Sequence, residues 1–551
     1  MTPLSFDPSP FGEPNASDRS DIENTYVDVT DVLSAKYITT NDITKAKIVV
    51  GRKGSGKTHL LRHIEILSRP KAQVCKYLSL GSDIFSGRGI RAFRGAMSPE
   101  ETTVFWAELW KAAFLLSALT IFYNQNPEKR AIRAIRACEG DVFHKETPDH
   151  IEDFRASVRK NYPQISWDPV PRRPLSPISM LSEITKRYTN LNSINEDFRK
   201  SLNFDELEYD VLQLLHQYGQ VHYIIDGLDE LAWADLTGWL DVQRGLFKCA
   251  FLLSAVSKST QYLKVTISIR NYVFNRSTQD PHADRTDAHL LKLNWDRDAA
   301  ESFLNQRLHS ALGGNFARSE VLEGPRPFAK WLGFETKLPS SRKIEESVEQ
   351  YLLRHTRLSP RNIIDALNKL ASVIGQAQRR QDVFGSDEFS EAISEIARDI
   401  AKKMLVTTAE EVVATIPGAE KVLAARQDDY RVQGEFLINM VADELEAAIA
   451  MMETEVVSRE KFRQLLELIA DFSIGSVSDK SKRQICRDIE GILWRSGLIA
   501  YRDGTDGPWK YSWADGEFGF SRPAVAAEEI GFHSSLIDLC GLKVTEDAPI
   551  F

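Results

Sequence analysis

Residues 47–61 read KIVVGRKGSGKTHLL and gather, within a few positions, the residue types that bind a polyphosphate. Gly51, Gly56, Lys57 and Thr58 fit the spacing G-x-x-x-x-G-K-[ST]. Glycine lets several backbone N–H groups turn inward around an anion, at dihedral angles that other residues adopt only at a cost. A lysine adds positive charge at the phosphates, and a threonine hydroxyl suits Mg²⁺. The pattern therefore predicts a phosphate-binding loop.

We expect the whole loop to line the phosphate site. Its residues are Gly51, Arg52, Lys53, Gly54, Ser55, Gly56, Lys57, Thr58 and His59. Lys57 is expected at the β- and γ-phosphates, and the Thr58 hydroxyl on the metal ion. A glycine-rich loop with an incidental lysine is the alternative. We disfavour it because an apolar run at 48–50 predicts a strand before the loop, and apolar periodicity from Leu60 predicts a helix after it.

A phosphate loop of this kind requires a carboxylate at the end of a second strand. Residues 221–231 read VHYIIDGLDEL, in which an apolar run ends at Asp226. We interpret this as a Walker B element whose Asp226 belongs to the Mg²⁺ shell. Glu230, or alternatively Asp229, is placed to orient the attacking water. An ordinary strand followed by an acidic turn is the competing interpretation, which the nearby phosphate loop makes less attractive.

The stretch IIDGLDEL resembles the Walker B of STAND-type NTPases, including the NACHT and KAP-like branches and uncharacterised bacterial relatives. These belong to the AAA+-like class of P-loop proteins. The resemblance covers roughly residues 40–375 and implies an α/β fold, with a parallel sheet and flanking helices followed by a helical lid. It also implies ATPase activity, with ATP and Mg²⁺ as cofactors. The choice of adenine over guanine rests on this resemblance alone.

The same resemblance implies two arginines near the γ-phosphate. Residues 262–274 are similar to a sensor-1 strand, with Ser268, Arg270 and Asn271 close to that phosphate. Residues 357–370 are similar to the lid helix that carries a sensor-2 arginine, here Arg361. An ordinary surface arginine is the alternative for either position.

The start of the lid helix also has a local signal. Ser359 suits an N-cap, and Pro360 suits the first helical position. Ile363, Ile364 and Leu367 then give the helix an apolar face.

With 551 residues, the chain is long enough for several domains. About 145 residues separate the strand expected at 72–80 from the Walker B strand, more than a compact core needs, so we interpret 125–200 as an insertion. The predicted organisation is an N-terminal extension (1–40), a P-loop core (41–310), a helical lid (311–378), a helical region (379–455) and a winged-helix-like C-terminal domain (456–551).

The C-terminal prediction rests on two expected helices followed by turn-rich DG pairs between residues 503 and 516. Lys480, Lys482, Arg483 and Arg487 cluster on the second helix, as in a DNA reader. However, residues 456–504 contain nine basic and seven acidic residues, a poor balance for DNA. We therefore favour a domain that packs on the NTPase core and regulates it.

Arg130, Arg133 and Arg136, within the insertion, share a helix face that could contact nucleic-acid phosphates; a solvated face is the favoured interpretation.

Composition narrows the cellular setting. A net charge of −9 argues against a nucleic-acid footprint over the whole chain. The five cysteines lack metal-ligand spacing, and their odd number suits a reducing compartment. The first residues lack the pattern of a signal peptide, and the apolar run at 112–122 is about half of what a bilayer needs. We predict a soluble, cytoplasmic protein without a membrane partner.

Two functional classes follow. The first is an ATP-binding and hydrolysing regulatory or assembly switch, with a homo-oligomer or a separate effector protein as partner. A bacterial stress or defence setting is typical of such relatives. The second is a DNA-handling ATPase similar to origin-recognition or repair loaders, with the winged helix on DNA. Nucleic acid is left open as a partner but is not favoured.

Overall fold

A computed structural model describes the parts of the chain that carry most of the predicted elements. The described residues are 11, 47–72, 74–79, 98–124, 176–187, 207–209, 211–212, 215, 219–228, 236–255, 262–277, 290–315, 326–337, 346–380, 382–419, 422–423, 434–475, 478–504, 507–512 and 527–545. Several predictions fall outside them: almost all of the N-terminal extension, most of the 125–200 insertion with its three arginines, and both Asp229 and Glu230.

The chain folds into two compact units, each described separately below. The sheet unit comprises Thr40–Val50 and Leu60–Leu291. The lid unit comprises Met1–Thr39, Gly51–His59 and Lys292–Phe551. The phosphate loop is thus grouped with the lid, although the strand before it and most of the helix after it belong to the sheet unit.

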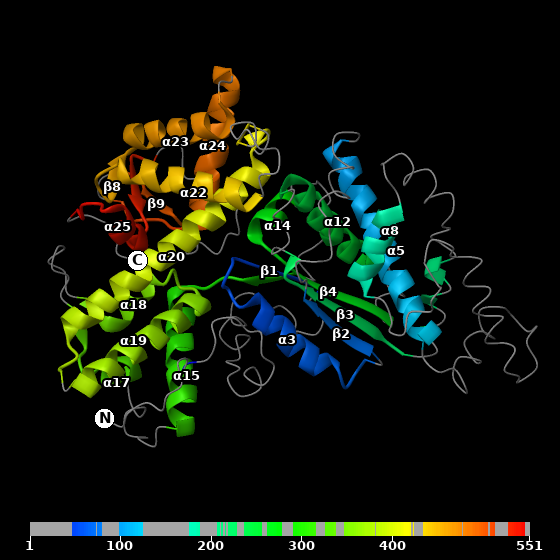
Figure 1. Cartoon of the computed structure of the whole chain (residues 1–551), viewed down its shortest axis with the longest axis horizontal. Helices are drawn as coiled ribbons and strands as arrows, with labels where there is room; N and C mark the ends of the chain where they lie inside the picture. Colours follow the sequence, from blue (N-terminus) through cyan, green and yellow to red (C-terminus); the bar gives the residue numbers. More distant parts are fainter. Residues whose placement is uncertain are drawn as a thin grey trace, which may run out of the picture. The chain divides into compact units, whose positions relative to one another are not determined.

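The fold is α/β, with a five-stranded sheet in the order β2-β3-β4-β1-β5. Figure 1 labels β1, β2, β3 and β4 of this sheet. The strands are β1 (Ile48–Gly51), β2 (Val74–Ser79), β3 (Val221–Asp226), β4 (Leu263–Ile269) and β5 (Leu290–Leu293). The pairs β1–β4, β3–β4 and β2–β3 are parallel. In the register, Val50 lies opposite Ile269. The carboxyl ends of β1, β3 and β4 therefore meet at one edge of the sheet, where α/β proteins bind their ligands.

Helices cover this sheet, and the two longest are strongly apolar. The helices are α3 (Lys57–Ser68), α5 (Pro99–Asn124), α8 (Pro177–Arg187), α12 (Leu236–Ala255) and α14 (Asn271–Ser277). α5 packs against α12 and α8 (Figure 1). The approach of α5 and α12 is close, because a Cβ on Gly245 would lie 2.2 Å from the Cβ of Trp106. α5 is also long and apolar enough to cross a membrane, but it is mostly buried, as is usual for a core helix.

The lid unit is mainly helical. Its first elements are α15 (Arg297–Asn315), α17 (Pro327–Leu332), the short strands β6 (Thr336–Lys337) and β7 (Glu346–Ser347), α18 (Val348–His355), α19 (Pro360–Arg380), α20 (Ser386–Thr415) and α22 (Gly434–Ala450). α19 begins at the expected proline, and its predicted apolar face (Ile363, Ile364, Leu367) is buried. α20 packs against α18, α19 and α22, and also against the C-terminal helices α24 (Asp479–Ser496) and α25 (Ser534–Cys540). This single helix therefore links the lid to the C-terminal elements.

The C-terminal elements combine two helices with a small antiparallel sheet. They are β8 (Val456–Ser458), α23 (Arg459–Ile474), α24 (Asp479–Ser496), β9 (Ile499–Arg502), β10 (Glu529–Phe532) and α25 (Ser534–Cys540). The sheet order is β8-β10-β9. Both expected helices are present and two strands follow them. The winged-helix assignment and the predicted domain boundaries remain predictions.

Candidate nucleotide-binding site

The phosphate loop has the backbone that its motif requires. It leaves the sheet at the end of β1, and α3 begins at Lys57. Gly54 (φ +84°) and Gly56 (φ +91°) both have left-handed backbones. The Ser55 N–H donates to the Arg52 carbonyl at 3.2 Å and closes a tight turn between them. The loop thus presents a helix N-terminus and turned amide groups, the arrangement that binds anions.

Lys57 is folded onto the loop. Its Nζ donates to the carbonyl oxygens of Gly51 at 3.0 Å and Arg52 at 2.9 Å, and only 8% of the residue is exposed. The ammonium is thus held beside the loop backbone rather than extended into water, as expected for the cation of a phosphate site.

One support of the loop was not predicted from sequence. The indole Nε1 of Trp295 donates to the Ser55 carbonyl at 2.9 Å. Trp295 follows β5, the strand beside β1, so its place in the sheet order brings it near the loop. A lone tryptophan after a short strand gives no local signal for such a contact.

The lid contacts the loop at Gly54. The Ser359 hydroxyl donates to the Gly54 carbonyl at 3.0 Å, and the Arg361 backbone N–H lies 3.4 Å from the same oxygen. A Cβ on Gly54 would lie 2.8 Å from the Ser359 Oγ and 3.3 Å from the Arg361 Cβ. The predicted sensor-2 residue is therefore beside the phosphate loop, and Ser359, at the predicted N-cap position, donates its hydroxyl to that loop.

The C-terminal region contacts the loop at Arg52. Its Nη2 donates to the Ser512 Oγ at 2.8 Å, across 460 positions of sequence. Burial lowers the pKa of Arg52 to about 10, and the nearby Glu411 on α20 acts in the opposite direction. Glu411 also pairs with Arg495 of α24 at 2.8 Å. The second residue of the phosphate loop thus joins a polar network built by α20, α24 and the segment after β9.

In the sheet unit, the carboxylate of Asp226, the predicted Walker B residue, is oriented by two hydroxyl groups. Asp226 Oδ1 accepts from the Ser268 Oγ at 2.5 Å, and Oδ2 accepts from the Tyr77 hydroxyl at 2.7 Å. Burial, and then the Asp226 charge, raise the pKa of Tyr77, so the phenol stays a donor. The Arg62 guanidinium lies 3.4 Å from the Tyr77 ring centroid. Each carboxylate oxygen keeps a further lone pair that could face a metal ion.

Ser268 was among the predicted residues, whereas Tyr77 was not. Tyr77 lies on β2, and only the pairing of β2 with β3 brings it to the Walker B strand.

The predicted sensor-1 residues lie at the end of β4. Arg270 directly follows this strand and is 3% exposed, and Asn271 begins α14. Both are thus at the sheet edge where β3 ends in Asp226. Among the described residues, no group of three or more His, Cys, Asp or Glu side chains could hold a metal. Mg²⁺ does not require one, since one carboxylate, one hydroxyl, phosphates and water commonly complete its shell.

Comparisons with known proteins add little to this geometry. No family model matches the chain, and no curated protein matches it. The chain is similar to the solved structure of the Walker-type ATPase PABY2304 of Pyrococcus abyssi, with 14% identity, a TM-score of 0.32, and coverage of 91% of this chain and 97% of that one. It is also similar to Cdc6p from Pyrobaculum aerophilum, with 11% identity, a TM-score of 0.27, and coverage of 97% and 98%. At these TM-scores neither likeness carries an argument, and the P-loop fold rests on the loop and the sheet.

Gly54→Ala should destabilise the chain through both its backbone and the lid contact. The positive φ alone costs about 1 kcal/mol for an alanine, and the clash with Ser359 adds about 1–3 kcal/mol. Gly418→Ala is the matched control, since Gly418 has φ +86° and no atom within 4 Å of its added Cβ. Thermal unfolding should show the larger fall in midpoint for Gly54→Ala. Equal falls would mean that the lid contact contributes nothing.

Proposed function

We propose that this chain is an ATP-binding and ATP-hydrolysing switch, in which the lid and the C-terminal region respond to the nucleotide held by the phosphate loop. One observation carries the proposal: neighbouring loop residues contact both regions, Gly54 through Ser359 and Arg52 through Ser512. Any nucleotide that reshapes the loop would act on both contacts. An ordinary phosphate-binding enzyme needs no such link to a distant C-terminal segment.

The described residues fit a bound Mg–nucleotide. Gly54 and Gly56 give the loop its turned amides, and Lys57 supplies the cation for the β- and γ-phosphates. Mg²⁺, when bound, would neutralise developing charge on the phosphates. We propose the Thr58 hydroxyl and the Asp226 carboxylate as its protein ligands.

The residues that would assist hydrolysis are also proposals. Glu230, or Asp229, would orient the attacking water. Arg270 and Arg361 would contact the γ-phosphate.

The alternative function, DNA handling, has weaker support. Lys480, Arg483 and Arg487 are exposed on α24, as a DNA reader would require. Lys482 of the same helix, however, forms an ion pair with Asp471 at 2.7 Å. This pair reduces the positive charge that α24 could present to DNA phosphates. We therefore favour the switch, with a second copy of the chain or a separate effector as its partner. A bacterial stress or defence setting is part of the same proposal.

Lys57→Ala should weaken Mg–ATP binding by about 10- to 100-fold, because it removes a charge-assisted hydrogen bond. ATP turnover should fall at the same time. Lys71→Ala is the matched control, since this lysine is exposed just beyond α3. Calorimetric titration with Mg–ATP and a phosphate-release assay measure both effects. Unchanged ATP affinity in Lys57→Ala would refute the assignment of the loop.

Ser512→Ala should separate binding from the switch. It removes one acceptor of the Arg52 guanidinium, the Ser512 hydroxyl, but leaves the loop sequence intact, so Mg–ATP affinity should stay within about threefold. The difference in trypsin cleavage with and without Mg–ATP should shrink relative to the parent. Ser512→Thr keeps the hydroxyl and should behave as the parent does. An undiminished ATP effect in Ser512→Ala would show that this contact transmits nothing.

A further inference from the structure

The turn between α18 and α19 has an unusual backbone. Arg357 (φ +57°) and Leu358 (φ +52°) are consecutive non-glycine residues in the left-handed region. The surrounding structure fixes this strained turn. The Thr356 carbonyl accepts from the Asn362 Nδ2 and from the Ser359 N–H, both at 3.1 Å. A strained turn that is held this firmly can place a particular side chain with little freedom.

The turn lies next to the phosphate loop. Ser359, two residues after Arg357, donates its hydroxyl to the Gly54 carbonyl. Arg357 is also close enough to Arg52 for the two charges to repel. Burial first, and then the Arg52 charge, place the pKa of Arg357 well below its ordinary value. The charges of two arginines thus act on one another beside the predicted phosphate loop.

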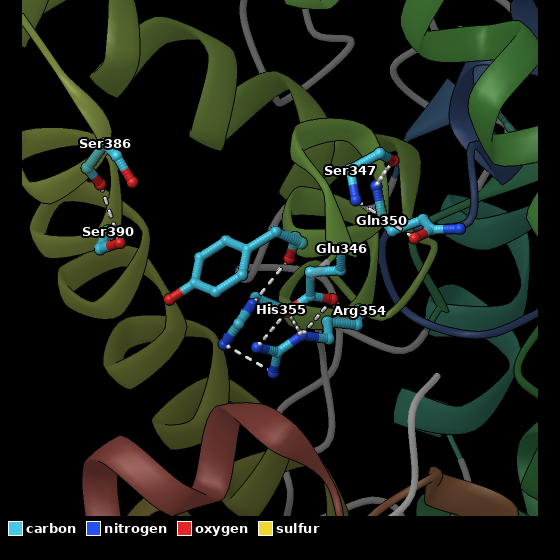
Figure 2. A network of polar contacts seen from close by, with 8 residues as sticks. Glu346, Ser347, Gln350, Arg354, His355, Ser386 and Ser390 are labelled. Atoms are coloured by element: carbon cyan, nitrogen blue, oxygen red, sulfur yellow. Dashed lines mark hydrogen bonds and ion pairs between the residues drawn. The ribbon is translucent and has the colours of Figure 1, made fainter. Parts of the chain in front are cut away.

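Arg354, three residues before Arg357, forms an ion pair with a carboxylate, whereas Arg357 forms none with a described carboxylate. Figure 2 shows Arg354 held by Glu346, with its Nε 3.1 Å from each carboxylate oxygen and its Nη2 2.9 Å from Oε1. For Arg357, no ion pair with a described carboxylate is found, and its buried Nε has no hydrogen-bond partner among the described residues. The positive charge of Arg357 is therefore not balanced as that of Arg354 is.

His533, which lies near these arginines, is neutral near pH 7. Burial first, and then the charges of Arg357, Arg354 and Arg52, lower its pKa to about 3. It therefore neither adds to the positive charge of Arg357 nor balances it. Glu411, whose charge acts on Arg52, already pairs with Arg495. Arg357 is half-buried, and its Nε is buried without a partner among the described residues. Removing part of a cation from water is costly when no countercharge is near, and an anion that arrives with a ligand reduces that cost.

We infer that Arg357 is a phosphate-binding residue of the nucleotide site, whose guanidinium is neutralised by the phosphates of the nucleotide bound in the adjacent loop. This rests on the proposed function. A guanidinium suits the task because its fork of N–H donors matches phosphate oxygens. Arg357 would then act alongside Lys57 in binding and would tie the α18–α19 turn to the presence of nucleotide.

Arg357→Met in the full chain tests the inference. Methionine has an unbranched side chain like the aliphatic part of arginine, and it should strain the backbone to a similar degree. It lacks the positive charge. Without nucleotide, the variant should unfold at a higher temperature than the parent, because it lacks a half-buried charge that no described carboxylate balances. Its affinity for Mg–ATP should fall about 10- to 100-fold, and the rise in unfolding temperature caused by Mg–ATP should shrink with it.

Arg354→Met is the matched control. It leaves Glu346 buried without its partner, so the chain should unfold at a lower temperature, while Mg–ATP affinity stays within about threefold. Arg357→Gln keeps hydrogen-bonding groups without the charge and should show the same loss of affinity as Arg357→Met; it serves if the methionine variant does not fold.

The outcomes separate this inference from the proposed function. If the parent binds Mg–ATP and Lys57→Ala binds it much more weakly, the nucleotide site stands. If Arg357→Met or Arg357→Gln then binds Mg–ATP as tightly as the parent, Arg357 is not a phosphate ligand. If the parent itself does not bind Mg–ATP, the proposed function fails first.

Discussion

The carbonyl oxygen of Gly54 is the acceptor on which the lid unit depends. It receives the Ser359 hydroxyl and faces the Arg361 N–H, and both can approach because Gly54 has no side chain and a left-handed backbone. In the proposed site, the same glycine turns the loop around a phosphate. One residue would then serve both the phosphate site and the start of α19. A change in the loop conformation would therefore directly alter the contacts at the N-terminus of α19.

Charge is the second constraint around the loop. Arg52, Lys57 and Arg357 bring three cations to a few neighbouring positions, and burial lowers the pKa of Arg52 and Arg357. Lys57 donates to two backbone carbonyls, and Arg52 donates to the Ser512 hydroxyl and lies near Glu411, which itself pairs with Arg495. Phosphates would bring additional negative charge to these three cations, and this gives the proposed switch a physical driving force.

The sequence predicted the parts of the site that are encoded locally. The loop, the strand ending in Asp226 and the start of α19 at Pro360 each follow from a short pattern of residue types. The contacts of Tyr77, Trp295 and Ser512 could not be predicted in this way, because strand order or long-range folding brings each to its partner. Ser359 was predicted as an N-cap from its position, but the acceptor of its hydroxyl hydrogen bond, the Gly54 carbonyl, lies 305 residues away. The roles of Asp229 and Glu230 remain predictions, as both lie outside the described residues.

Hydrogen–deuterium exchange of the full chain, with and without Mg–ATP, tests the central claim most directly. The claim is that a nucleotide in the phosphate loop acts on the lid and the C-terminal region together. Peptides covering residues 51–59, 356–363 and 507–512 should all change their exchange rates when Mg–ATP is added, and none should change in Lys57→Ala. A change confined to residues 51–59 would mean that nucleotide binding at the loop alters neither the lid nor the C-terminal region. That result would contradict the account.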